Sequence, residues 1–334
     1  MKKLTRIAAG LAIAVGTFSS QAALAVDRVT AVHAFPSSLI YTKSFLSFVD
    51  KVNENGKGVV EIVVRGGPEA IGLAQQPEAV RNGVVDMAYT AASFYAGTVP
   101  ERDALVASNA NAEYARKNGG LDLLNQIHQE KMGVYYLGWF DSGVSYNLYT
   151  VNEPKFTDGK IDVTNMRLRS NPVYDAFFKD YLKAQPINLP TTDVYSALER
   201  SVANATGWTQ IGLKDLGWDK FLKYRVGPDF FSTDMGVIVN LDAWNELSDA
   251  AKKVLQDTAI QHEIESSNEF AKLAEEQAAE LKANGMTFVS LPGNGDAEFE
   301  KAAKEATWAR MREQMEKHPT KLTHYNALIE KFNK

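Results

Sequence analysis

The side chains most often used in catalysis are not arranged for it in this sequence. His262-Glu263 lacks the second histidine of a zinc-protease helix, and neither a G-x-S-x-G elbow nor a P-loop is present. Carboxylate pairs occur on predicted long helices, where a charge run usually forms the solvated face. The five histidines are scattered along the chain: His33, His128, His262, His318 and His324. Because there is also no cysteine, we expect no catalytic residue, no metal ion and no cofactor.

Aromatic residues stand out at the ends of predicted strands and in the loops that follow. Ligand pockets are mostly apolar and aromatic, and in α/β sheets they open at the carboxyl ends of strands. For any single aromatic residue core packing is the commoner role, but the grouping of so many at strand ends favours a pocket. The residues are Phe35, Tyr89, Phe94, Tyr95, Trp139, Phe140, Tyr146, Tyr149, Trp208, Phe230 and Phe231.

Strand-like and helix-like segments alternate along the chain, which is typical of an α/β fold with mainly parallel strands. The predicted strands are residues 28–35, 59–65, 85–90, 133–140, 146–151, 166–169, 187–189 and 202–206. The predicted helices are residues 37–53, 75–82, 110–131, 173–183, 194–200, 248–284, 296–317 and 323–332. The same order of elements occurs twice, on either side of the connecting strand 146–151, so the sequence predicts two lobes.

A short match supports this duplication. Residues 79–86 (AVRNGVVD) can be laid beside residues 197–204 (ALERSVAN), and each reads as a helix end that runs through a small residue into a strand. Chance reuse of a common α/β junction accounts for the match about as well as a true repeat does.

The long segment 248–284 predicts how the lobes are joined. It has a cap residue, an acidic first turn, no proline or glycine inside, and Gly285 where a helix should end. Such a helix is about 55 Å long, whereas a lobe of 150 residues measures only some 30–40 Å. We therefore expect it to cross both lobes, with a coiled-coil dimer arm as the alternative. Its predicted apolar stripe is Val254, Leu255, Ile264, Ala271, Ala274, Ala278 and Leu281.

The N-terminus predicts export. Lys2, Lys3 and Arg6 precede a short apolar run, and small residues before Val26 suit signal-peptide cleavage. Losing these three positive charges would take the net charge from -5 to -8, which argues against nucleic acid or an anionic membrane surface as a partner. We expect residues 1–25 to be removed and the exported mature chain to be a soluble monomer.

Two stretches carry a resemblance to a known family. Residues 159–172 (GKIDVTNMRLRSNP), followed by residues 193–198 (DVYSAL), resemble the core of the DctP-type solute-binding proteins of TRAP transporters. Residues 78–87 (EAVRNGVVDM) and the long helix extend the similarity over nearly the whole mature chain. The resemblance implies a two-lobed periplasmic-binding-protein fold that closes around a small organic anion and delivers it to the membrane permease subunits of the transporter.

The resemblance also implies a role for one arginine. In that family a strand arginine pairs with the carboxylate of the ligand, and Arg169 falls on this position. A guanidinium offers a planar fork that matches two carboxylate oxygens and keeps its charge when buried. Without the resemblance a surface role would be the commoner one for an arginine. Arg167, two residues away, is the alternative contact.

The chain departs from relatives such as the sialic-acid receptors at two positions. Asn147 stands where they carry a second arginine, and their ligand-binding asparagine falls near Trp208. One guanidinium among aromatic side chains suits a compact monoanion, such as a hydroxy or oxo acid, or a sulfonate. Tyr146 and Asn147 are predicted to donate hydrogen bonds to its remaining oxygen. The predicted ligand-binding set is Arg169, Trp208, Asn147, Tyr146, Tyr89, Phe35, Trp139 and Phe231.

These inferences define a receptor with its ligand cleft between the lobes. Residues 26–145 are predicted to form lobe I and residues 146–234 lobe II. Residues 235–334 are predicted to supply a strand, the helix 248–284 and C-terminal helices that pack on both lobes and return in part to lobe I. Two alternatives remain, a periplasmic enzyme acting on a small organic acid in the same cleft and a ligand sensor for a membrane kinase.

Overall fold

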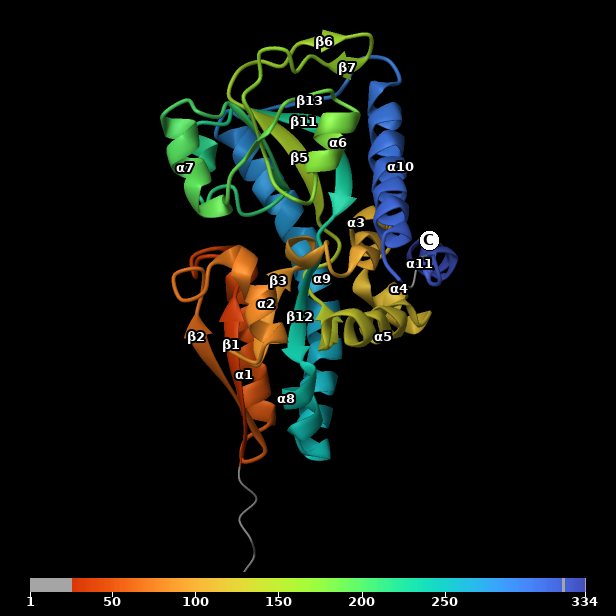
Figure 1. Cartoon of the computed structure of the whole chain (residues 1–334). Coiled ribbons are helices and arrows are strands. Elements are labelled where there is room, and N and C mark those ends of the chain that lie inside the picture. Colours follow the sequence, from red (N-terminus) through yellow and green to blue (C-terminus); the bar gives the residue numbers. More distant parts are fainter. Residues whose placement is uncertain (1–25, 320–321, 334) are drawn as a thin grey trace, which may run out of the picture.

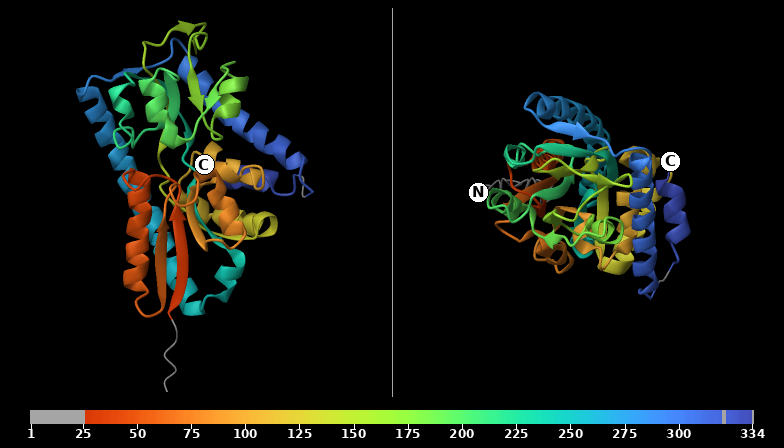
Figure 2. Two further views of the ribbon diagram at one scale, coloured as in Figure 1. Left: turned by 60° about the vertical axis from the view of Figure 1, so that its left-hand side comes forward. Right: turned by 90° about the horizontal axis from the view of Figure 1, so that it is seen from above.

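The computed structural model describes residues 26–319 and 322–333 and has two lobes, one above the other in Figure 1. The predicted signal peptide, residues 1–25, lies outside the described residues. Each lobe is built around a sheet with helices against it, and two long helices run past both lobes (Figures 1 and 2). None of the described helices is long and apolar enough to cross a membrane. The expected α/β fold with two lobes is thus the observed one.

The sheet of lobe I has the strand order β2-β1-β3-β12-β4 within the described chain. β1 pairs in parallel with β2 and β3, whereas β12 is antiparallel to both of its neighbours. The strands are β1 (Asp27–His33), β2 (Val60–Gly66), β3 (Met87–Ala91), β4 (Val134–Trp139) and β12 (Met235–Asn240). The helical segments of lobe I are α1 (Ile40–Asn55), η1 (Leu73–Gln75), α2 (Gln76–Arg81), η2 (Ala92–Tyr95), η3 (Pro100–Arg102), α3 (Asp103–Ala107), α4 (Ala112–Lys117), α5 (Gly120–Met132), α8 (Leu241–Glu246) and α11 (Tyr325–Phe332).

The sheet of lobe II has the strand order β13-β11-β5-β10-β8-β9 in the described chain. Its strands are β5 (Ser145–Thr150), β8 (Leu168–Ser170), β9 (Ile187–Asn188), β10 (Ala205–Thr209), β11 (Tyr224–Ser232) and β13 (Thr287–Val289). Its helical segments are α6 (Asp175–Asp180), α7 (Thr191–Glu199) and η4 (Trp218–Lys220). A small hairpin of β6 (Phe156–Thr157) and β7 (Lys160–Ile161) lies at the far end of the lobe (Figure 1).

Two extended segments cross between the lobes. One joins β4 to β5 through residues 140–144, and the other joins β11 to β12 through residues 233–234. Hydrogen bonds tie the two crossings together: Thr233 donates its hydroxyl to the Asp141 carbonyl at 2.7 Å, and its amide to the Val144 carbonyl at 3.1 Å. These paired crossings form the hinge region of the molecule.

The predicted long helix is α9 (Asp249–Ala283), capped by Ser248, whose hydroxyl accepts from the Ala251 amide. Its 35 residues extend about 52 Å and pass from lobe I to lobe II (Figure 1). The predicted apolar stripe is wrong in its middle, since Ile264 and Ala271 are exposed. The buried face there is polar because the helix passes the hinge region, where the Ser266 hydroxyl accepts from the Asp141 amide.

The predicted helix over residues 110–131 is also wrong as a single element. It is divided into α4 and α5, because Gly119 adopts a positive φ of 77° that turns the chain. The apolar spacing of each half is helical, so periodicity alone did not reveal the break.

The two helix ends that the sequence matched do share a geometry. After α2 the amide of Val84 donates to the Ala79 carbonyl at 2.9 Å, and after α7 the amide of Val202 donates to the Ala197 carbonyl at 2.8 Å. Both are helix ends closed through a left-handed residue, Gly83 or Ser201. Val202 therefore belongs to the turn, and the strand predicted for residues 202–206 is observed as β10, three residues later.

Candidate ligand-binding site

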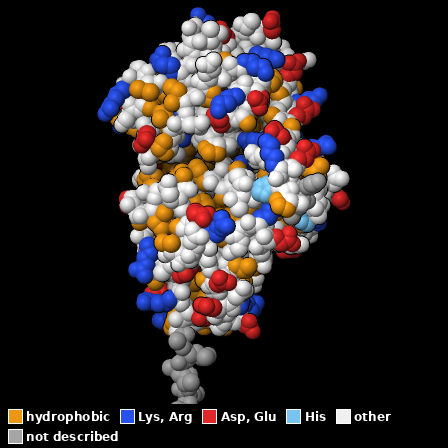
Figure 3. Space-filling model, viewed as in Figure 1, with side chains coloured by type: hydrophobic (Ala, Val, Ile, Leu, Met, Phe, Trp, Pro, Cys, Tyr) orange, Lys and Arg blue, Asp and Glu red, His pale blue; other side chains and the backbone are white. Residues whose placement is uncertain are grey.

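A cavity of about 1030 Å³ lies between the two lobes. Lobe I contributes η1, η2 and neighbouring loops, and lobe II contributes the end of β8 and the start of α7. A smaller cavity of about 20 Å³ shares the lining residues Phe94, Asn171 and Thr191 with it and reaches further between the sheets. Figure 3 shows the hollow between the lobes, with hydrophobic side chains along its edges. The two cavities together form the ligand cleft, the main cavity outside and the inner cavity within.

Arg169 lines the main cavity from β8 and is only 1 % exposed. Its Nε donates to the Leu189 carbonyl at 2.9 Å, and its Nη1 donates to the Tyr174 hydroxyl at 2.5 Å. Its guanidinium carbon lies 5.9 Å from the centroid of the Trp218 ring. These contacts hold the guanidinium in one orientation and leave Nη2 without a hydrogen-bond partner in the described part of the chain.

Arg169 differs from the other two arginines that line the main cavity, Arg102 and Arg310. Both of those pair with the carboxylate of Asp103 at 2.7 Å. Across residues 26–319 and 322–333, no carboxylate lies within 4.0 Å of the Arg169 guanidinium. A buried charge without a partner is unfavourable, so the cleft holds a positive charge that an anion would neutralise.

The start of α7 adds to this positive potential. Thr191 and Thr192 form its first turn and line the main cavity, and no side chain caps the helix at Pro190. Free amides and the helix dipole at an N-terminus favour a negative ligand. Since Arg169 holds the loop before this helix through the Leu189 carbonyl, the two anion-attracting features are fixed relative to each other.

Four members of the predicted set line the cleft. Arg169 lines the main cavity, while Phe35, Tyr146 and Trp208 line the inner cavity. Burial raises the pKa of the Tyr146 phenol well above its usual value, so the hydroxyl stays protonated. Trp208 is held by a hydrogen bond from its indole nitrogen to the Ile211 carbonyl at 3.1 Å.

The other four members lie away from both cavities. The Tyr89 hydroxyl donates to Asp141 inside lobe I, and the Trp139 indole donates to the Thr233 carbonyl at 2.8 Å. The Asn147 amide donates to the Asp229 carboxylate at 2.8 Å, and the ring of Phe231 packs on Phe177 in the lobe II core. The structure therefore does not bring these four side chains together with Arg169. Arg167, the alternative to Arg169, is exposed and donates its Nε to the Ser201 carbonyl at 2.9 Å.

The sequence-based set missed several residues of the cleft. Asn171 lines both cavities, and its side-chain oxygen accepts from the Val173 amide at 2.9 Å. Its position two residues after Arg169 in the matched stretch was a usable signal. Tyr41 lines the inner cavity and Thr191 lines both, but neither had a signal in the sequence beyond its place near the start of a predicted helix, residues 37–53 for Tyr41 and residues 194–200 for Thr191.

Tyr174 supports Arg169 from behind. Its hydroxyl accepts from Arg169 and donates to the Gly207 carbonyl at 2.6 Å. A Cβ added at Gly207 would lie 2.8–3.1 Å from three atoms of the Tyr174 ring. Glycine at this position of β10 therefore lets the tyrosine lie flat against the strand.

The Gly207→Ala variant tests this support. We expect it to lower the free energy of unfolding by about 1–3 kcal/mol, because the ring must shift in a packed core. The variant should also bind its ligand more weakly, because Arg169 loses its fixed orientation. Chemical denaturation and titration calorimetry measure the two effects. Gly97→Ala is the control, since an added Cβ there meets no heavy atom within 4 Å. Parental affinity in Gly207→Ala would show that Tyr174 does not orient Arg169.

No group of three or more His, Cys, Asp and Glu side chains in the described residues could hold a metal ion. Two α/β lobes with a cleft between them, and a buried arginine that has no carboxylate partner among the described residues, are typical of a solute-binding receptor. The chain belongs to the DctP family, bacterial extracellular solute-binding protein family 7, whose model matches residues 31–316. The resemblance seen in the sequence is confirmed, and the family and fold are those of receptors, not of enzymes.

Individual relatives agree with this assignment. A monocarboxylate 2-oxoacid-binding periplasmic protein of Nostoc sp. is 24 % identical over 294 residues, 82 % of this chain and 76 % of the relative. A Bordetella pertussis extracytoplasmic solute receptor that binds pyroglutamic acid superposes with a TM-score of 0.76 at 18 % identity, over 91 % of this chain and 99 % of that one. A marine metagenome TRAP solute-binding protein specific for pyroglutamate gives a TM-score of 0.76 at 19 % identity, over 92 % of this chain and 98 % of that one.

Proposed function

We propose that this receptor binds a small monocarboxylate, such as a 2-oxo or hydroxy acid, with the carboxylate on Arg169. The observation that carries the proposal is the buried guanidinium of Arg169, which has no carboxylate partner among the described residues. Its Nη2 can donate to a carboxylate oxygen of the ligand, and a hydrogen bond between two charged groups is strong in a closed cleft. The adjacent start of α7 would stabilise the same negative charge.

The inner cavity supports a compact ligand with one charge, because its volume of about 20 Å³ has room only for a small group such as a single oxygen. It is lined mainly by aromatic and apolar side chains, and it offers neutral donors such as the Tyr146 hydroxyl. A second carboxylate there would have to be desolvated without a counter-charge, at a cost of several kcal/mol. A keto or hydroxyl oxygen carries no such cost. The 2-oxoacid and pyroglutamate ligands named for the relatives are also monocarboxylates.

Capture proceeds by closure of the two lobes in this proposal. A ligand that contacts Arg169 in lobe II and Phe35 in lobe I binds the closed state better than the open one, and therefore shifts the equilibrium toward closure. The receptor releases its ligand unchanged to the permease subunits of a TRAP transporter. We further propose that residues 1–25 are cleaved on export to the periplasm and that the mature receptor is a monomer.

A thermal-shift screen of the mature protein tests the proposal. The panel contains 2-oxo acids, hydroxy acids and pyroglutamate, each with its amide and a dicarboxylate of similar length as matched controls. At 100 times its dissociation constant a ligand stabilises by about 2.7 kcal/mol, which is a shift of several degrees. We expect a monocarboxylate to raise the melting temperature, and its amide and the dicarboxylate to have little effect.

Other outcomes of the screen would overturn specific parts of the proposal. A dicarboxylate that binds more tightly than every monocarboxylate would reject the ligand class. A ligand converted to product during incubation, detected by mass spectrometry, would indicate an enzyme.

A further inference from the structure

Helix α10 (Gly295–Glu316) packs against both lobes along its length. In its first half Phe299 and Ala303 belong to the lobe II core. In its second half Trp308, Met311 and Met315 belong to the core of lobe I. Arg310 lies on the part of the helix that faces the gap between the lobes and lines the main cavity. A movement of one lobe against the other therefore has to change the contacts of α10 with one of them.

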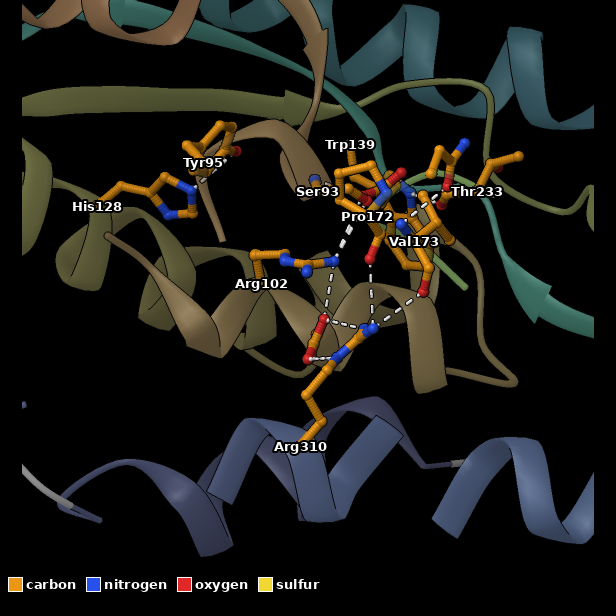
Figure 4. A network of polar contacts seen from close by, with 12 residues as sticks. Ser93, Tyr95, Arg102, His128, Trp139, Pro172, Val173, Thr233 and Arg310 are labelled. Atoms are coloured by element: carbon orange, nitrogen blue, oxygen red, sulfur yellow. Dashed lines mark hydrogen bonds and ion pairs between the residues drawn. The ribbon is translucent and has the colours of Figure 1, made fainter. Parts of the chain in front are cut away.

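Arg310 binds groups of both lobes at once (Figure 4). Its Nε and Nη2 donate to the two carboxylate oxygens of Asp103 in lobe I, each at 2.7 Å. Its Nη1 donates to the carbonyls of Pro172 and Val173 in lobe II, at 3.3 and 3.0 Å. These two carbonyls follow Arg169 by three and four residues, on the loop that also carries Asn171 into the cleft. One side chain thus links lobe I to the loop that holds the ligand-binding arginine.

The link continues to the hinge region. Asp103 also pairs with Arg102 at 2.7 Å, and Arg102 donates to the Ser93 hydroxyl at 3.2 Å and lies 3.8 Å from the Asp234 carboxylate (Figure 4). Asp234 is in the crossing between β11 and β12, and it accepts from the Ser93 amide at 2.7 Å. Two aspartates compensate the two arginines in this network.

We propose that Arg310 is a positioning residue that favours the closed cleft by joining the Arg169 loop to lobe I. Its bonds to Asp103 and to the Pro172 and Val173 carbonyls can exist at the same time only while the two lobes are close together, so they stabilise closure whether or not a ligand is present. The bonds to Asp103 fix the guanidinium fork in the required orientation. Because Arg310 acts on closure, it sets the affinity for every ligand by the same factor.

The Arg310→Lys variant tests the proposal. A lysine keeps a positive charge beside Asp103, but one ammonium cannot reproduce the fork and also reach both carbonyls. The chain has no cysteine, so Val84→Cys in lobe I and Glu199→Cys in lobe II, both exposed, accept spin labels without background. We expect the distance between the labels in ligand-free protein to shift to longer values in Arg310→Lys. A saturating monocarboxylate should restore the parental distribution.

The affinity of the receptor for each acid provides the second part of the test. We expect Arg310→Lys to raise the dissociation constant of each bound acid by about tenfold, the loss of one charge-assisted hydrogen bond, with the rank order unchanged. Arg312→Lys is the matched control, since Arg312 lies on the same helix, pairs with Glu316 at 3.2 Å and lies over the Tyr325 ring, away from the cleft. We expect parental distances and affinities in that control.

Two results would overturn the proposal. An unchanged ligand-free distance distribution would show that Arg310 does not bias closure, and this result requires no ligand. If Arg310→Lys weakened the binding of only some of the acids, Arg310 would be a direct contact of those ligands. If Arg310→Lys is unfolded at the temperature of measurement, Arg310→Gln replaces it, because the glutamine amide can still donate to Asp103. The same label distances and affinities are then measured, and the same two results would overturn the proposal.

Discussion

Replacing Arg169 by alanine is expected to weaken ligand binding by about 2–5 kcal/mol, which is about 30-fold to several thousand-fold in the dissociation constant. The variant would leave the carboxylate of the ligand in a closed cleft without its counter-charge. The ligand-free protein should melt close to the parental temperature, because a buried and unpaired guanidinium is itself unfavourable there. Titration calorimetry with a monocarboxylate from the screen measures the affinity.

Arg167→Ala is the matched control for this change. Arg167 lies two residues away but is exposed and bonded to the Ser201 carbonyl, so its loss should leave affinity unchanged. Arg169→Lys should fall between the parent and Arg169→Ala, because an ammonium provides charge without the planar fork. Equal affinity in Arg169→Ala and Arg167→Ala would remove Arg169 from the site.

Replacing Asp103 by alanine is expected to have the largest effect on stability, a loss of about 3–5 kcal/mol in the free energy of unfolding. Asp103 is fully buried and is the carboxylate shared by Arg102 and Arg310. Burial lowers the pKa of Arg102, and the charge of Asp103 opposes that shift. Without the aspartate, two largely buried guanidinium groups would repel each other. Urea denaturation followed by circular dichroism measures the loss.

The control for Asp103→Ala is Glu113→Ala. Glu113 pairs with Lys117 on an exposed face of α4, where ion pairs contribute little. We expect its denaturation midpoint to match the parent. If Asp103→Ala unfolds at the same urea concentration as this control, the buried arginines are stable without the shared carboxylate and the network does not stabilise the fold.

Local sequence signals gave most of the elements of this fold. The cap at Ser248 and the stop at Gly285 predicted α9 to within one residue at each end, because capping depends on residues next to the helix terminus. Where a residue acts through backbone conformation the signal was weaker. Gly119 divides α4 from α5, although both halves have helical apolar spacing.

The candidate site was less predictable than the fold. Tyr146 lines the inner cavity, whereas the next residue, Asn147, donates to Asp229. Successive side chains of a strand point in opposite directions, so only the observed pairing and lobe contacts decide which of the two meets a ligand. Trp139 and Tyr89 also end predicted strands, yet their polar atoms bond to Thr233 and Asp141 within the protein.

By itself the sequence determined the α/β class, the two lobes, the long connecting helix and the choice of Arg169, because these depend on local periodicity, caps and a recognisable stretch around one arginine. Only the tertiary structure decided which arginines of the cleft are neutralised. Asp103 and Arg310 are separated by 207 residues, and their pairing leaves Arg169 as the arginine of the main cavity without a carboxylate partner among the described residues. Charge compensation depends on distances in space, which the order of residues along the chain does not specify.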